Sequence, residues 1–200
     1  MLSPHNVTGI LERVPLFPWI RYLKDVVPYA ESGLVLMDES PTSHAVLDVT
    51  FGKRKQVLVE GVEVDYKVAA TWRDWQQQVQ KAEEYDFVVL PVFHSIKNRQ
   101  GGHIPVKEVI QWTSEHCRVP VFANQDYAVG DDGLVGAYVV RGEGHGRAAA
   151  VLALGILDNR TPQMPLINMD QKGQFFFNRK QLDRFNLSLP EKIAAQAIFR

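Results

Sequence analysis

Polar and aromatic side chains follow three short apolar runs of this chain, and their types suit the binding of a small molecule. Carboxylates can hold an ammonium group, hydroxyls and amides can bond a carboxylate or an amide, and aromatic rings can cover an apolar body. A zwitterionic or amide-bearing ligand would use all three kinds of group. The candidate ligand-binding residues are Asp38, Glu39, Ser40, Phe93, His94, Ser95, Asn124, Gln125, Asp126 and Tyr127.

Several of these residues also have an ordinary structural interpretation. Loop residues such as Ser40 and Asp126 often cap a helix or stabilise a turn. Trp72, which follows another expected strand, fits the apolar side of a helix better than a ligand stack. His94 stands before a polar, glycine-containing segment, so it could simply be exposed. The candidates are therefore more persuasive as a group than singly.

The sequence offers no recognisable catalytic or metal-binding pattern. Its histidines lack the i, i+4 spacing with a carboxylate that zinc enzymes use, and Cys117 is the only cysteine. The G-x-S-x-G turn of serine hydrolases is absent as well. We therefore predict a protein that is not an enzyme and that uses no cofactor and no metal.

One glycine-rich segment leaves a nucleotide-dependent enzyme as the least favoured alternative. Gly142, Gly144 and Gly146 stand between a strand-like and a helix-like run, as in a dinucleotide-binding turn. That motif needs a further glycine where Arg147 stands, and Glu143 would place negative charge beside a pyrophosphate. A tight turn or a hinge explains the glycines better.

Composition excludes two classes of partner. The chain has 200 residues, of which 46% are hydrophobic and 22% charged, with a net charge of -1. Without a concentrated basic segment it has no surface for nucleic-acid phosphates. No apolar run approaches the roughly 20 residues that span a bilayer, and no signal-like apolar core stands near the N-terminus. The sequence thus predicts a globular chain.

Strand-like and helix-like runs alternate along the chain. Apolar or alternating runs predict strands over 34–37, 62–70, 87–90, 119–123, 134–140 and, more briefly, 174–177. Helices are expected over 43–59, 71–85, 105–117, 146–157, 179–185 and 190–199. Such alternation predicts an α/β fold with a doubly wound parallel sheet. Because the carboxyl ends of parallel strands meet at one edge, the candidate residues should gather there.

The chain resembles the extracytoplasmic solute-binding proteins of an ABC-transporter family, which includes tryptophan and phenylalanine binders. The resemblance rests on NVTG at 6–9, on VPVFANQDYAVGDDGLVGAYVVRGEGHGRAAAVLALGIL at 119–157, and on TPQMP followed by FFFNRKQLDRFNLSLP. It implies the type I periplasmic binding fold, in which two hinged α/β lobes hold a ligand between them. It also points to the same loops, at 38–40, 93–95 and 124–127.

The resemblance implies a domain organisation as well. NVTG normally lies near the first crossover between lobes, so most of the first lobe would be missing here. Residues 1–32 would be the crossover segment and first helix, and 33–140 the ligand-binding lobe. Residues 141–200 would contain a glycine hinge, an apolar helix and a C-terminal segment that pack on the missing lobe. That helix would lack its usual partner, which predicts self-association as a possible homodimer.

The segment VFHSIKNRQGGHIP, at 92–105, is longer and more basic than the usual turn of the family. It is similar to solute-binding modules fused to bacterial sensor receptors, although Lys97 and Arg99 fit a solvated loop better than an anion site. The expected function is an extracytoplasmic, periplasmic domain that closes over an amino-acid-like solute and is recognised by a membrane permease or receptor. The alternative is a ligand-free interaction module of a signalling receptor.

Overall fold

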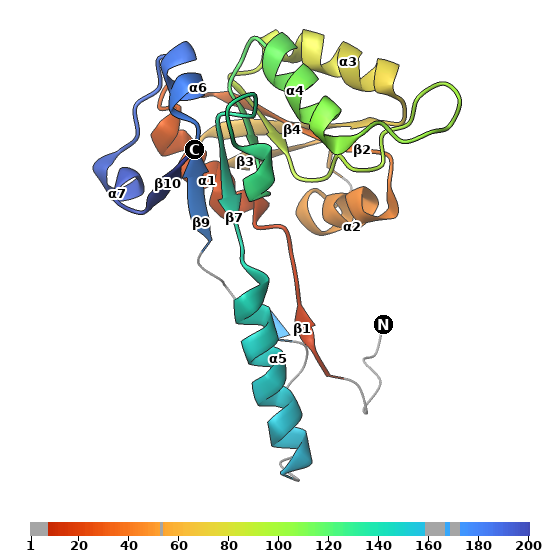
Figure 1. Ribbon diagram of the computed structural model, residues 1–200, viewed down its shortest axis with the longest axis vertical. Coiled ribbons are helices and arrows are strands. Elements are labelled where there is room, and N and C mark those ends of the chain that lie inside the picture. Colours follow the sequence, from red (N-terminus) through yellow and green to blue (C-terminus); the bar gives the residue numbers. More distant parts are fainter. Residues whose placement is uncertain (1–7, 53, 159–166, 169–172) are drawn as a thin grey trace. The chain divides into compact units, whose positions relative to one another are not determined.

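The computed structural model describes residues 8–52, 54–158, 167–168 and 173–200 (Figure 1). The chain divides into two compact units, which we call the sheet unit (14–139 and 174–200) and the small unit (1–13 and 140–173). The first two residues of the NVTG motif and all of the TPQMP segment lie outside the described residues. The sheet unit extends beyond the lobe expected at 33–140, because a helix before it and two strands after it belong to the same sheet assembly.

An eight-stranded sheet in the order β10-β9-β7-β6-β5-β2-β4-β3 forms the centre of the sheet unit. Its parallel strands are β4 (Val62–Ala69), β2 (Ser32–Asp38), β5 (Phe87–Leu90), β6 (Val121–Ala123) and β7 (Gly136–Val139). The antiparallel additions are β3 (Gln56–Val59) beside β4, and β9 (Gln174–Phe177) beside β7 with β10 (Ala197–Phe199) parallel to β9. The α/β class with a parallel sheet is thus confirmed.

Helices cover both faces of this sheet (Figure 1). α1 (Leu16–Val26) and α2 (Pro41–Thr50) pack on one face, and α3 (Trp72–Lys81) and α4 (Val106–His116) pack on the other. Along β2 the buried side chains alternate between the two cores: Val35 and Met37 face one, Leu34 and Leu36 the other. A strand covered on both faces reads as a continuous apolar run, which is how the sequence shows it.

Two helices expected from the sequence are shorter than predicted. The run 43–59 is helical only to Thr50; Gly52, at φ +61°, breaks it, and 56–59 form β3 with alternate residues buried. The run 190–199 contains the short α7 (Glu191–Ala194) and then β10, which pairs with β9. In both cases pairing with a neighbouring strand overrides a local pattern that also suits a helix.

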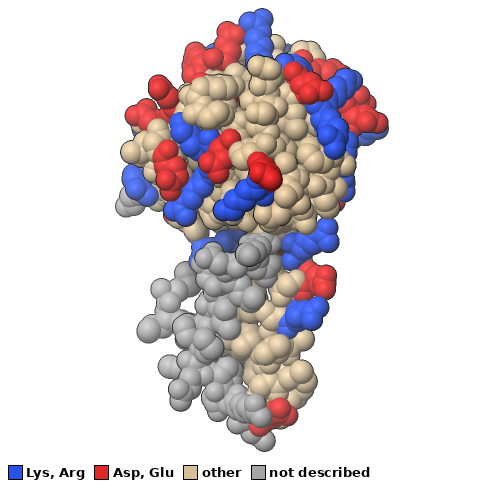
Figure 2. Space-filling model, turned by 90° about the vertical axis from the view of Figure 1, so that its left-hand side faces the viewer, with Lys and Arg blue, Asp and Glu red and all other residues tan. Residues whose placement is uncertain are grey.

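The remaining elements of the sheet unit are short. They are the 3-10 turns η1 (Ala82–Glu84) and η2 (Asp126–Ala128), and the helix α6 (Arg179–Arg184). On the face shown in Figure 2, basic and acidic side chains are interspersed over this unit without a continuous basic surface.

The small unit contains one long helix and one short strand pair. β1 (Ile10–Leu11) pairs with β8 (Ile167–Asn168), and α5 runs over Gly142–Leu157, starting four residues earlier than the helix expected from Gly146. No residue of α5 is buried, and Val151, Leu154 and Leu157 are 66%, 60% and 77% exposed. Within the described residues, no helix combines the length and apolar character needed to cross a membrane.

Gly136 on β7 is a tight point of the sheet, and replacing it tests the β7–β9 pairing. A Cβ there would lie 2.6 Å from Phe177 and 2.9 Å from the Phe176 carbonyl oxygen. We expect Gly136→Ala to lower the free energy of unfolding by about 1–3 kcal/mol in urea denaturation. Gly155→Ala on α5, where an added Cβ meets nothing within 4 Å, is the control and should not lower it. Equal stability of Gly136→Ala and the parent would contradict the tight pairing.

Candidate functional site

The candidate residues come from loops that follow β2, β5 and β6, three neighbouring parallel strands. These strands end at one edge of the sheet, which we call the carboxyl edge. Hydrogen bonds connect the loops: Ser95 N donates to Asp38 Oδ2 at 2.7 Å, and Gln125 Nε2 donates to the Pro91 carbonyl oxygen at 3.2 Å. His94 and Tyr127 are also joined by a hydrogen bond. The structure therefore brings the three loops together as topology predicts, although their role in binding stays a prediction.

Asp38 is fully buried and its carboxylate is already occupied by the protein itself. One oxygen accepts a hydrogen bond from Ser43 Oγ at 2.9 Å, and the other accepts the Ser95 bond. The main-chain nitrogen of Asp38 donates to the Val92 carbonyl oxygen at 3.0 Å. Burying a carboxylate is costly unless it is hydrogen-bonded, and these bonds also tie the loop after β2 to the loop after β5. A role of Asp38 in ligand binding stays a prediction.

Glu39 and Ser40 have partners at the start of α2. Ser40 is its N-cap, and its hydroxyl accepts a hydrogen bond from Ser43 N at 3.2 Å. Glu39 and His44 are both exposed, and Glu39 Oε1 lies 2.5 Å from His44 Nε2. These contacts are the capping and turn roles that such loop residues commonly play.

His94 and Tyr127 form the exposed aromatic part of the edge. The His94 ring stacks on the fully buried Phe93, with centroids 4.8 Å apart and planes 19° from parallel. Its Nε2 is hydrogen-bonded to the hydroxyl of Tyr127, whose side chain is 52% exposed. Partial burial, with a smaller effect of the Asp126 charge, raises the pKa of Tyr127, so its phenol stays neutral near pH 7.

Asn124 and Gln125 carry buried polar atoms that are not used by the described part of the protein. Asn124 Oδ1 and Gln125 Oε1 have no hydrogen-bond partner among the described residues. An unpaired buried acceptor costs about 1–3 kcal/mol. A hydrogen-bond donor placed near either amide oxygen at the carboxyl edge would therefore be stabilising.

Asp126 is paired with a residue far along the chain. Arg200 Nη2 lies 3.0 Å from Asp126 Oδ2, its Nη1 donates to the Asp126 carbonyl oxygen at 2.7 Å, and its guanidinium lies over the Phe176 ring. This clasp holds the loop after β6 against the β9–β10 pair. Sequence reasoning did not connect Asp126 with Arg200. Lys97 and Arg99 are exposed, in keeping with a solvated loop.

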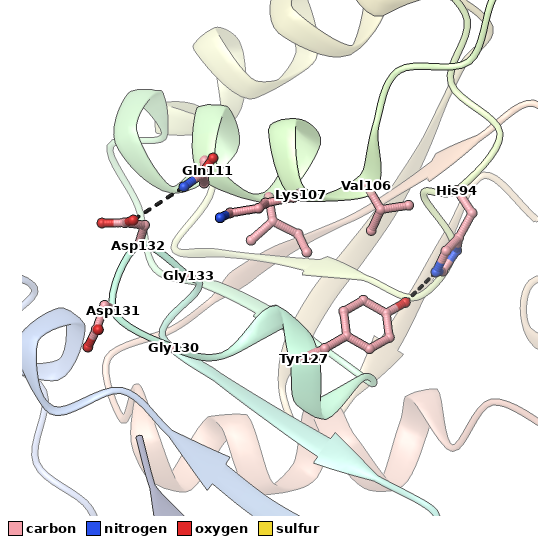
Figure 3. Close-up of a pocket in the computed structure, with 10 residues that line it drawn as sticks. His94, Val106, Lys107, Gln111, Tyr127, Gly130, Asp131, Asp132 and Gly133 are labelled. Atoms are coloured by element: carbon pink, nitrogen blue, oxygen red, sulfur yellow. Dashed lines mark hydrogen bonds between the residues drawn. The ribbon is translucent and has the colours of Figure 1, made fainter.

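A pocket of about 730 Å³ lies beside α4 and contains residues that sequence reasoning did not include in the site (Figure 3). Only His94 and Tyr127 were among the candidates. The pocket residues are His94, Val106, Lys107, Ile110, Gln111, Tyr127, Gly130, Asp131, Asp132 and Gly133. The only signal in the sequence was the pair of glycines that bracket Asp131 and Asp132 between two strands, since α4 itself reads as an ordinary core-facing helix.

Other chemistry finds no support in the described residues. They contain no group of three or more histidine, cysteine or acidic side chains placed to hold a metal ion. Burial raises the pKa of Cys117 to about 11, so its thiol stays protonated near pH 7. Gly142, Gly144 and Gly146 lie inside the first turns of α5 instead of forming a loop before it.

Three solved structures share this fold at low sequence identity. An ABC domain in complex with L-Trp from Streptococcus pneumoniae matches with a TM-score of 0.66 and 17% identity, over 97% of this chain and 63% of that one. A ligand-free, open substrate-binding protein with adhesive properties from Clostridium difficile matches with a TM-score of 0.62 and 16% identity, over 96% of this chain and 61% of that one. A conserved domain protein from Vibrio cholerae matches with a TM-score of 0.62 and 17% identity, over 97% of this chain and 62% of that one.

These matches establish the fold. The chain spans less than two thirds of the length of these three proteins. No protein-family model matches the chain, and no curated protein sequence matches it. The chain thus shares its fold with an ABC domain that holds L-Trp and with a substrate-binding protein, at low sequence identity.

The contacts of Asp38 predict a large effect on stability in the absence of any ligand. Asp38→Ala leaves the Ser95 amide and the Ser43 hydroxyl without their acceptor, so we expect a loss of about 2–4 kcal/mol in the free energy of unfolding. Glu39→Ala, which removes the neighbouring exposed carboxylate, should change it by less than about 1 kcal/mol. Urea denaturation of both variants measures the difference, and similar values for the two would contradict the assigned role of Asp38.

Proposed function

We propose that this chain is a non-enzymatic solute-binding domain that holds an amino-acid-like small molecule at the carboxyl edge of its sheet. Its role would be extracytoplasmic, in the periplasm, where the liganded form is recognised by the permease of an ABC transporter or by a sensor receptor. Binding would favour a closed state by its differential affinity for that state. The fold shared with a substrate-binding protein and with an ABC domain holding L-Trp supports this proposal.

The proposal is carried by the side-chain amide oxygens of Asn124 and Gln125, which are buried and have no hydrogen-bond partner among the described residues. They lie at the end of β6, next to the half-exposed ring of Tyr127. An ammonium or N–H group of a ligand would supply the missing donor, and the ring would cover an apolar body. Asp38, Ser40 and Phe93 would act indirectly, by fixing the loops that carry these groups.

The exposed apolar side chains of α5 favour a second proposal, a self-associating interaction module. We expect the chain to form a dimer at micromolar concentration, measured by light scattering, and Leu154→Glu to shift it toward the monomer. Val49→Glu on α2, at a residue with the same 60% exposure, is the matched control and should leave the mass unchanged. A strictly monomeric parent protein would remove this proposal.

Binding is tested by calorimetry and thermal unfolding with the twenty common amino acids, L-tryptophan included. A ligand at a hundred times its Kd stabilises the native state by about 2.7 kcal/mol, so a true ligand raises the unfolding temperature in a saturable way. Asn124→Ala and Gln125→Ala should each weaken binding about tenfold, because each removes a hydrogen bond to a charged group. Gln77→Ala, on the exposed side of α3, is the control and should bind like the parent. Unchanged affinity in both edge variants would place the ligand elsewhere.

A further inference from the structure

The pocket beside α4, which we call the α4 groove, exists because one crossover of the sheet lacks a helix. The connections β2–β4, β4–β5 and β5–β6 contain α2, α3 and α4, but the connection from β6 to β7 contains only the 3-10 turn η2. A right-handed crossover helix between β6 and β7 would pack next to α4 on the same face of the sheet. The α4 groove occupies that place.

Charged groups that make no ion pair with a described residue gather at one end of the groove. Lys107 projects from α4, and Asp131 and Asp132 come from the β6–β7 connection (Figure 3). Gln111 Nε2 donates to Asp132 Oδ2 at 3.2 Å, whereas Lys107 and Asp131 make no ion pair with any described residue. The pocket thus presents one cation, Lys107, and two carboxylates, Asp131 and Asp132, that make no ion pair with a described residue.

The other part of the groove is apolar and aromatic. The buried side chain of Ile110 and the half-buried Val106 line it from α4. Toward its far end stands the Tyr127 ring, whose hydroxyl is held by His94 (Figure 3). The groove therefore has one end with charges of both signs and one apolar part. Its volume lies within the usual range of small-molecule sites.

The wall opposite α4 is fixed before any ligand arrives. The carbonyl oxygen of Gly133 accepts a hydrogen bond from Ser114 Oγ of α4 at 2.7 Å, and that of Gly130 accepts one from Asn178 Nδ2. Gly133 is so closely packed that a Cβ there would lie 2.5 Å from the Ala128 carbonyl oxygen. A wall held in this way loses little conformational entropy on binding.

We propose that the α4 groove is a second ligand site, for a small zwitterion with an apolar body. The ligand carboxylate pairs with Lys107 and its ammonium group with Asp131, while its apolar part lies against Val106, Ile110 and Tyr127. A purely anionic ligand would leave Asp131 and Asp132 without a counterion, and a purely cationic one would leave Lys107 without one. The groove therefore favours a molecule that carries both charges. The site shares the Tyr127 ring with the carboxyl edge but uses neither Asn124 nor Gln125, so the two proposals are tested by different residues.

The test is a titration of the ¹⁵N-labelled full chain with L-leucine, followed through its amide NMR signals. N-acetyl-L-leucine, which lacks the ammonium group, and L-leucinamide, which lacks the carboxylate, are the matched ligands. L-Leucine should give saturable shifts at 106–111 and 130–133, and each matched ligand should bind there at least about threefold more weakly.

Two charge-removing variants complete the test. Lys107→Gln and Asp131→Asn should each weaken L-leucine binding at the groove about three- to fivefold, the range expected for exposed charge pairs. Lys81→Gln and Asp48→Asn remove exposed charges of the same kinds from α3 and α2 and should bind like the parent. Shifts confined to 124–126, equal binding of the three ligands at the groove, or no saturable shift at 106–111 would each overturn the proposal. The first of these outcomes would leave the carboxyl-edge function standing.

Discussion

The arrangement of the carboxyl edge depends on the buried carboxylate of Asp38. Its two oxygens accept hydrogen bonds from the start of α2 and from the main chain after β5, so one side chain sets the spacing of two loops. His94 lies directly before Ser95, the residue that donates to Asp38, and its hydrogen bond to Tyr127 extends the same network to the loop after β6. Polar side chains at this edge are therefore positioned by a charge that never meets solvent.

Asp38 can play this part because of the strand that carries it. β2 is paired with β4 on one side and β5 on the other, and apolar side chains cover both of its faces. A strand held on four sides has little freedom to shift its register, since a slip of one residue would exchange the two cores. A strand that is paired on both sides and covered on both faces thus carries Asp38 at its carboxyl end.

Sequence patterns identified the elements whose signal is local. The continuous apolar runs of β2 and β5 and the Thr71 cap of α3 each depend on a few neighbouring residues, and the structure has them where expected. The edge strands β3 and β10 were read as helix because short runs acquire their strand form only from a partner. The Asp126–Arg200 clasp joins residues 74 positions apart, and the α4 groove arises from a helix that is missing from a crossover. Neither leaves a periodic trace in the sequence.

The short connection between β6 and β7 contributes to two different surfaces. Its first residues, Asn124 and Gln125, stand at the carboxyl edge, and its later part, from Gly130 to Gly133, forms a wall of the α4 groove. With η2 as its only regular element, the connection has little room to absorb a change at one end without moving the other. Occupancy of one surface that shifts this connection would alter affinity at the other, and thermodynamic linkage requires the effect to be equal in both directions. A crossover without an α-helix can in this way couple two binding equilibria.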